Sequence, residues 1–355
     1  MMMLLKLLKL CLFTTLLYST LVTSLQDGIC VLYANDDTRS FYFSGVTVSG
    51  ALNPQLLDFS NWDSVRCGLD SGENEDTIYI IPEGVGKNPN MTIATVHTQT
   101  NGTATISYSV LGQVPGFEGV APYTFMPVVH LDKKRNQMIA ALEGQSGPSQ
   151  LLSPPASPLR DPGDLFLVIA DVFPSNGTVS KVWLDLSEED LRWGTASLSG
   201  VSAFDGYSFW LNPVGGNTPS EQALYGFPIN GTATTAVPYG NQLNLAHLFF
   251  SAAQSSLLAV LDNGDAHSTL ARFSPPSPEF IPIFSWNLTS NEQDYGLYDV
   301  SPDESKLLSV IVDKNGEGPI LVIVDLVTLK EIQRIPIKDF QNSDTLVDVN
   351  WCNVK

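Results

Sequence analysis

Three turns of the sequence carry the oxygen atoms that a hard metal ion binds. Segment 35–37 reads Asn-Asp-Asp, segment 262–267 reads Asp-Asn-Gly-Asp-Ala-His, and segment 313–317 reads Asp-Lys-Asn-Gly-Glu. Calcium prefers carboxylate and carbonyl oxygens, so Asp36, Asp262 and Asp313 are candidate calcium ligands. The same sequences also make tight turns, because Asn and Gly adopt positive φ at little cost, and the spacing of a complete calcium loop is absent. Turn formation alone is therefore the simpler interpretation.

The sequence contains none of the motifs that usually mark a catalytic centre. It lacks a Gly-x-Ser-x-Gly nucleophile turn, a His-Glu-x-x-His zinc motif, a phosphate-binding loop and a dinucleotide-binding glycine pattern. An isolated histidine in a sheet is usually a hydrogen-bonded side chain, and the four histidines are isolated: His97, His130, His247 and His267. No catalytic residue is therefore assigned.

Two tryptophans are candidates for stacking on a ligand. Trp62 and Trp193 lie in connections between predicted strands, where an aromatic ring can be exposed to a sugar or to a partner side chain. Three others lie within strand patterns and are expected to pack between sheets: Trp183, Trp210 and Trp286.

The N-terminus has the pattern of a secretory signal peptide. Lys6 and Lys9 precede the apolar run 10–22, which ends in the small residues Val-Thr-Ser at 22–24. A membrane anchor is the alternative, but the uncharged stretch is near the lower length limit for a span and no basic residue follows it. We expect residues 1–24 to be removed, and residues 25–355 to form a secreted, extracellular protein without further membrane insertion.

The charge of the mature chain restricts its partners. The sequence has 18 basic and 37 acidic residues, and loss of Lys6 and Lys9 changes the net charge from −19 to −21. Nucleic acids and anionic lipids need Lys or Arg to neutralise phosphate, so both are excluded as expected partners.

Cysteines and glycosylation motifs agree with an oxidising compartment. Cys11 belongs to the signal peptide, so Cys30, Cys67 and Cys352 remain, enough for one disulfide and one thiol. Five Asn-x-Ser/Thr motifs predict N-glycosylation: Asn90, Asn101, Asn176, Asn230 and Asn287.

Short β-branched and aromatic runs separated by turn residues predict an all-β fold. The clearest unit, 295–337, contains a strand, a Ser-Pro-Asp turn, a second strand, a Gly-containing turn, and two further strands. Four antiparallel strands of this kind make one propeller blade. The unit resembles the blade repeats of the TolB and YVTN propeller families, which implies a β-propeller.

Four further units repeat this order. In one unit the expected strands are 243–250, 256–261, 268–273 and 279–286, and in a second they are 199–205, 207–211, 223–229 and 232–237. In a third they are 125–132, 137–142, 165–172 and 180–186, and in a fourth they are 64–70, 77–82, 91–97 and 103–110. A sixth blade combines 345–351 as its first strand with 28–34, 41–48 and 54–59, so that the two chain ends share one blade and close the ring.

Some features leave the architecture open. Long connections at 112–123 and 144–164 could hide a degenerate seventh blade, and a two-sheet sandwich array is the fallback. A short helix is expected at 187–193, where Ser187 could cap an acidic first turn.

The blade model favours one disulfide. It places Cys30 and Cys352 on neighbouring strands, within the reach of a disulfide, whereas sequence spacing alone equally allows Cys30–Cys67.

The blade model also distinguishes two sides of the ring. Three glycosylation motifs read Asn-Gly-Thr, at Asn101, Asn176 and Asn230, and each falls between a third and a fourth strand. Such turns project from one side of a propeller, so their glycans would shield that side and leave the opposite side, with the acidic turns, open.

The function expected from these features is extracellular binding. A secreted, glycosylated propeller without a catalytic motif is predicted to be a binding module for protein or carbohydrate. The alternative is a calcium-dependent hydrolase or lactonase-like enzyme, supported by the acidic turns and the YVTN-like blade. Propellers host both kinds of function, so fold alone does not decide between them.

Overall fold

The structure is a computed structural model, and it describes most of residues 28–352. The residues outside the description are 1–27, 54–56, 60–61, 63, 72–75, 84–91, 100–102, 113–127, 133–134, 136, 146–164, 188–198, 215–222, 231–234, 240–243, 263–267, 316–317, 339, 341–342 and 353–355. Three predicted features therefore lie outside the described residues. They are the signal peptide, the long connections 112–123 and 144–164 except for residues 112, 144 and 145, and the helix 187–193 except for Ser187. Ser187 itself is the last residue of a strand.

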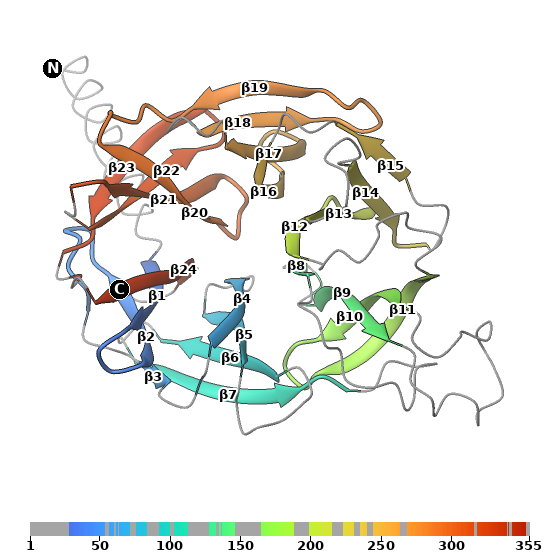
Figure 1. The fold of residues 1–355 in the computed structure, drawn as a ribbon, viewed down its shortest axis with the longest axis horizontal. Coiled ribbons are helices and arrows are strands. Elements are labelled where there is room, and N and C mark those ends of the chain that lie inside the picture. The colour runs from blue at the N-terminus through green and yellow to red at the C-terminus, as the bar shows by residue number, and fades with distance from the viewer. Residues whose placement is uncertain are drawn as a thin grey trace, which may run out of the picture.

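The described chain forms six four-stranded antiparallel sheets arranged in a ring (Figure 1). Blade 1 contains β24 (Asp344–Cys352), β1 (Gly28–Asn35), β2 (Ser40–Val46) and β3 (Leu57–Phe59). Blade 2 contains β4 (Ser64–Ser71), β5 (Thr77–Glu83), β6 (Thr92–Thr98) and β7 (Ala104–Val110); blade 3 contains β8 (Val128–Asp132), β9 (Gln137–Gln145), β10 (Leu165–Phe173) and β11 (Thr178–Ser187). Blade 4 contains β12 (Ser199–Phe204), β13 (Ser208–Val214), β14 (Ala223–Pro228) and β15 (Thr235–Pro238); blade 5 contains β16 (Asn244–Ser251), β17 (Ser256–Asp262), β18 (Ser268–Phe273) and β19 (Phe280–Ser285); blade 6 contains β20 (Glu292–Val300), β21 (Lys306–Asp313), β22 (Pro319–Asp325) and β23 (Lys330–Pro336).

This arrangement confirms the predicted six-bladed propeller with the two chain ends in one blade. The first strand of each blade lies nearest the centre of the ring, and the fourth lies at the rim (Figure 1). Among the described residues no helix is long and apolar enough to cross a membrane.

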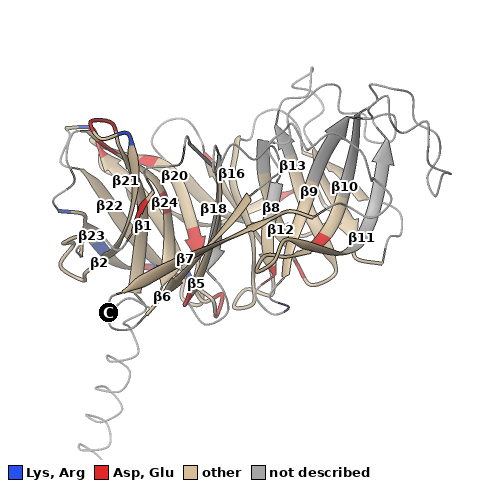
Figure 2. Ribbon diagram, turned by 90° about the horizontal axis from the view of Figure 1, so that it is seen from below, with Lys and Arg blue, Asp and Glu red and all other residues tan. Residues whose placement is uncertain are grey.

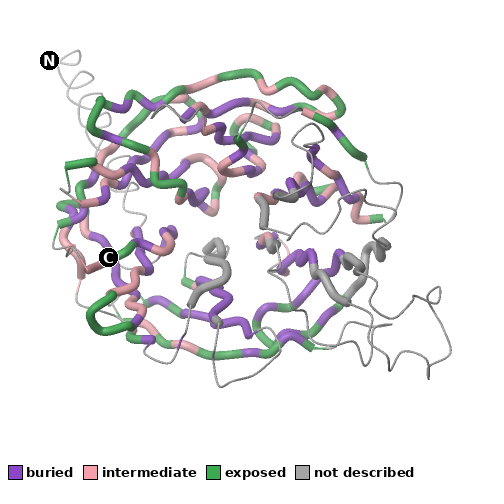
Figure 3. Tube along the Cα trace, in the orientation of Figure 1, coloured by how far each residue is buried: buried purple, intermediate pink, exposed green. Residues whose placement is uncertain are grey.

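The core lies between neighbouring blades. The middle strands β17 and β21 are buried along most of their length, since both faces of each sheet pack against another sheet. One core cluster joins Leu258 and Val260 of blade 5 to Leu307 and Ile311 of blade 6. Exposed residues are concentrated on the rim strands (Figure 3).

The Ser-Pro-Asp turn of blade 6 is held by its own side chains. The Ser301 hydroxyl donates to Asp303 Oδ1 at 2.6 Å and accepts the Lys306 amide at 2.9 Å. The Ser305 hydroxyl donates to Asp303 Oδ2 at 2.7 Å. These short-range bonds explain why Ser-Pro-Asp specifies this turn locally.

The ring is closed by the pairing of β24 with β1. Gly28 pairs with Cys352 and Cys30 with Asn350, so the two cysteines are diagonal neighbours. They form the predicted disulfide, with their Cα atoms 5.8 Å apart. This confirms Cys30–Cys352 over Cys30–Cys67.

Buried polar contacts connect β24 to the blade on its other side. The Asp299 carboxylate on β20 accepts the Trp351 amide at 2.8 Å, and Asp299 is buried. Hydrogen bonds therefore join β24 to β1 within blade 1 and to Asp299 of blade 6.

Two glycines allow a third-to-fourth turn to contact the preceding blade. Gly50 of blade 1 and Gly177 of blade 3 have φ of +81° and +71°. The Lys338 amide donates to the Gly50 carbonyl at 2.7 Å, and the Gly112 amide donates to the Gly177 carbonyl at 2.8 Å. A Cβ atom at either glycine would overlap a carbonyl oxygen, that of Pro336 or Val110 respectively.

Removal of the disulfide should destabilise the ring. The bond joins residues 322 positions apart, and closing so long a loop stabilises by about 6 kcal/mol in the chain-entropy model. Replacing both Cys30 and Cys352 by Ala should lower the free energy of unfolding by about this amount, measured by denaturant titration. Wild-type protein under reducing conditions is the control and should lose a similar amount; equal stability of the oxidised wild type and the double variant would contradict this role.

Two glycine variants distinguish the effect of the contact between Gly177 and Val110 on stability from the effect of a positive φ alone. Gly177→Ala should cost about 3 kcal/mol, because the new methyl group meets the Val110 carbonyl in a strained conformation. Gly206→Ala is the matched control: Gly206 has φ +93° but nothing within 4 Å of an added Cβ, so only about 1 kcal/mol should be lost. Equal losses in the two variants would show that the contact between blades contributes nothing.

Candidate binding face

The two faces of the ring carry different kinds of turns. Strands alternate in direction within each blade, so second-to-third turns share one face with the connections from one blade to the next. We call this the acidic face, because the turns after β1, β17 and β21 include Asp36, Asp262 and Asp313. The opposite, sequon face holds the turns after β10 and β14, which contain Asn176 and Asn230. Figure 2 shows the ring from the side, with strands running between these faces.

The three candidate calcium ligands lie on the acidic face of three consecutive blades. Asp36 is exposed, Asp262 accepts Asn244 Nδ2 at 3.2 Å, and Asp313 accepts the Asn315 amide at 2.7 Å. The Asp313 contact is an Asx turn, which agrees with the simpler interpretation from the sequence. Within the part of the chain that the structure describes, no three His, Cys, Asp or Glu residues gather closely enough to hold a metal ion. Asp36, Asp262 and Asp313 thus share one face, and the calcium site stays a prediction.

The inner strands are bulged near the acidic face. Ala246 on β16 and Val347 on β24 are each one extra residue in the pairing with the next strand. In β20 the irregularity is larger, because residues 295–297 stand opposite Val310 alone. Bulges are frequent at the rims of closed sheets and beside binding sites, where they redirect side chains.

A network of polar side chains fixes the bulge of β20. Asp294 accepts hydrogen bonds from the Ser268 hydroxyl of blade 5 and from the Tyr298 hydroxyl, and it accepts the Gly296 amide at 2.9 Å. Burial raises the pKa of Tyr298 and the adjacent Asp294 carboxylate raises it further, so the phenol stays protonated and donates. The His247 ring of blade 5 stacks on Tyr298 with ring centroids 5.3 Å apart.

The sequence does not predict this network. His247 is an isolated histidine in the sequence, and no motif marks Asp294 or Ser268. Ser268 and Asp294 are 26 residues apart and lie on different blades, so no local spacing indicates their contact. The Asp-Tyr-Gly-Leu-Tyr sequence at 294–298 was the available signal, since Gly in a strand often marks a bulge.

The prediction that Trp62 offers an exposed stacking surface is wrong. Trp62 is 3% exposed. Its ring stacks on Phe59 with centroids 4.0 Å apart, and its Nε1 donates to the Tyr108 hydroxyl at 3.2 Å. Burial removes the large apolar surface of this ring from water. This stabilises the fold more than an exposed ring in a connection would. Trp193 lies outside the described residues, whereas Trp210 and Trp286 are buried as expected.

The glycosylation motifs are divided between the two faces. Asn176 and Asn230 are exposed in third-to-fourth turns, as predicted. Asn90 and Asn101 lie outside the described residues. Asn287 is exposed in the connection between β19 and β20, and therefore on the acidic face near the rim. Glycosylation at Asn287 would cover part of the rim of the acidic face, which is thus not free of sequons.

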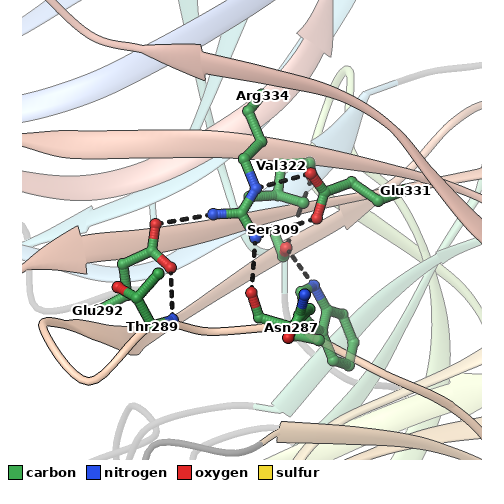
Figure 4. A network of polar contacts seen from close by, with 8 residues as sticks. Asn287, Thr289, Glu292, Ser309, Val322, Glu331 and Arg334 are labelled. Carbon is green, nitrogen blue, oxygen red and sulfur yellow. Dashed lines mark hydrogen bonds and ion pairs between the residues drawn. The ribbon is translucent and has the colours of Figure 1, made fainter.

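An arginine on the rim strand holds the connection that contains Asn287 (Figure 4). Arg334 donates to the Asn287 carbonyl at 3.1 Å, and it forms ion pairs with Glu292 at 2.7 Å and Glu331 at 2.6 Å. Glu292 in turn accepts the Thr289 amide at 2.8 Å. The segment entering β20 is therefore anchored before the bulge begins.

Comparisons with known proteins show similarity in structure alone. No protein-family model matches the sequence. No curated protein matches it either. One similar solved structure is a prolyl endopeptidase, with 13% identity, a TM-score of 0.48, and coverage of 87% of this chain and 49% of that one, so this chain spans about half its length.

Two further solved structures are similar to a comparable degree. An oligogalacturonate lyase from Vibrio parahaemolyticus has 12% identity and a TM-score of 0.42, with coverage of 88% of this chain and 82% of that chain. The β-propeller domain of the Trilobed protease from Pyrococcus furiosus has 10% identity and a TM-score of 0.42, with coverage of 89% and 82%. The strand order of the described residues, and not these similarities, shows that the chain is a six-bladed β-propeller.

Proposed function

We propose that this protein is a secreted, glycosylated propeller that binds an extracellular protein or carbohydrate through its acidic face. The observation that carries the proposal is the set of bulged inner strands, which belong to four consecutive blades. Bulges redirect side chains at a rim where a ligand can reach them.

The disulfide supports an extracellular location. Cys30–Cys352 is the bond that completes the ring, and such bonds persist in oxidising compartments. The signal-peptide pattern at residues 1–24 and the five glycosylation motifs agree with this location.

The rigidity of the acidic face supports binding. The bulge of β20 is fixed by the Asp294 contacts, and the segment before it is fixed by Arg334. A surface whose side chains are already held in place loses less conformational entropy when it binds.

A glycan added to the acidic face should block binding. Glu317→Thr converts the turn at 315–317 of blade 6 into an Asn-Gly-Thr acceptor. The variant should lose binding both to proteins of the culture medium of the source organism and to immobilised oligosaccharides, measured by affinity capture and an array, because the added glycan covers the face.

The matched control removes a glycan from the opposite face. Thr178→Ala abolishes the motif at Asn176 and keeps the Asn-Gly turn, so binding should be unchanged. Glycopeptide mass spectrometry verifies both changes. Equal binding by the wild type and Glu317→Thr, once occupancy is verified, would contradict the acidic face as the binding surface.

Calcium as a ligand of the acidic turns has a separate test. If Asp36, Asp262 and Asp313 contribute to one or more calcium sites, calcium should raise the melting temperature and a chelator should lower it, because a ligand that binds the native state stabilises it. Alanine at each position should reduce the calcium-dependent shift. An unchanged melting temperature with calcium and with chelator would exclude the metal.

A further inference from the structure

The bulge of β20 presents an aromatic ring on the acidic face. Tyr295 is 37% exposed, whereas Tyr298, three residues later on the same strand, is 8% exposed. Both belong to the Asp-Tyr-Gly-Leu-Tyr sequence that forms the bulge. The irregular pairing therefore separates two tyrosines, one held in the core and one left partly open to solvent.

The position of Tyr295 is fixed by contacts at both ends. Its hydroxyl donates to the Leu346 carbonyl on β24 at 3.1 Å, and its backbone lies in the turn closed by Asp294 and the Gly296 amide. A ring held in this way is pre-organised, so little side-chain entropy remains to be lost when a ligand stacks on it.

The residue after Tyr295 carries no side chain. Gly296 has φ +80° and nothing within 4 Å of an added Cβ. The glycine is thus required for the backbone conformation of the bulge and not by a close neighbour. Gly296, next to Tyr295 in the chain, thus has no side chain that could compete with a ligand for the ring.

Groups that can hydrogen-bond to a ligand lie at the same end of the inner strands. Gln293 precedes the ring by two residues and is exposed, and the exposed Thr345 is next to Leu346, which accepts the Tyr295 hydroxyl. Amide and hydroxyl groups around an exposed aromatic ring match the two surfaces of a sugar, which has polar hydroxyls at its edge and polarised C–H groups on its face. The electron-rich face of an aromatic ring attracts such C–H groups.

We propose that Tyr295 is a stacking platform for a pyranose ring, and that the ligand is a neutral oligosaccharide. A neutral ligand is favoured because a mature net charge of −21 repels acidic sugars. This inference rests on the proposed function, and it chooses carbohydrate over protein as the ligand of the acidic face.

The test compares two substitutions at Tyr295 with a control on the other face. The probes are immobilised neutral oligosaccharides of glucose, mannose, galactose and N-acetylglucosamine. Wild-type protein should bind at least one of them, and Tyr295→Ala should bind about tenfold more weakly or worse, as expected for loss of a central aromatic anchor. Tyr207→Ala is the control, since Tyr207 is 78% exposed in a first-to-second turn on the sequon face, and its affinity should equal that of the wild type.

Tyr295→Phe separates stacking from a structural role. Both Tyr295→Phe and Tyr295→Ala lose the bond to Leu346, so a purely structural role predicts that both lose sugar binding along with melting temperature. A stacking role predicts that Tyr295→Phe keeps its affinity within about threefold while Tyr295→Ala does not.

Three results would overturn the inference: no neutral oligosaccharide binds at millimolar concentration, Tyr295→Ala binds like the wild type, or Tyr295→Phe is as defective as Tyr295→Ala. Failure of the inference differs from failure of the proposed function. If no sugar binds but Glu317→Thr still blocks capture of an extracellular protein, the acidic face binds protein and only the carbohydrate inference is rejected.

Discussion

The pairing of β24 with β1 is the constraint on which the rest of the structure depends. Each blade buries both faces of its sheet against neighbours, so a row of blades with free ends would leave apolar sheets exposed to water. Sharing blade 1 between the two chain ends removes both free ends at once. The disulfide between Cys30 and Cys352 converts this hydrogen-bonded closure into a covalent one.

Once the ring is closed, contacts between blades are polar as well as apolar. Asp299 links blade 6 to the Trp351 amide of blade 1, and Glu304 of blade 6 accepts the Ala252 amide of blade 5 at 2.9 Å. Glu304 has φ +57°, a conformation that is unfavourable for a residue with a side chain. The contact with blade 5 offsets this cost, so backbone strain in a turn is used to join neighbouring blades.

The same rigidity defines the binding face. The Asp294 network joins Ser268 of blade 5 to the bulge of blade 6, and Tyr295 joins that bulge to β24 of blade 1. Three consecutive blades therefore hold one exposed aromatic ring in place. A site built in this way on inner strands keeps its geometry better than one built on long loops.

The sequence by itself determined the approximate positions of the strands, because alternating apolar residues and turn residues act over a few positions. It favoured six blades and Cys30–Cys352, because the two chain ends complete one four-strand pattern, and the structure decided both against the alternatives. It also placed Asn176 and Asn230 in exposed turns for the same local reason. Only the tertiary structure decided that Trp62 is buried against Phe59 and that His247, Ser268 and Asp294 meet at the bulge of β20. These contacts join residues of different strands and blades, and they depend on how closed sheets pack against one another, which no local pattern encodes.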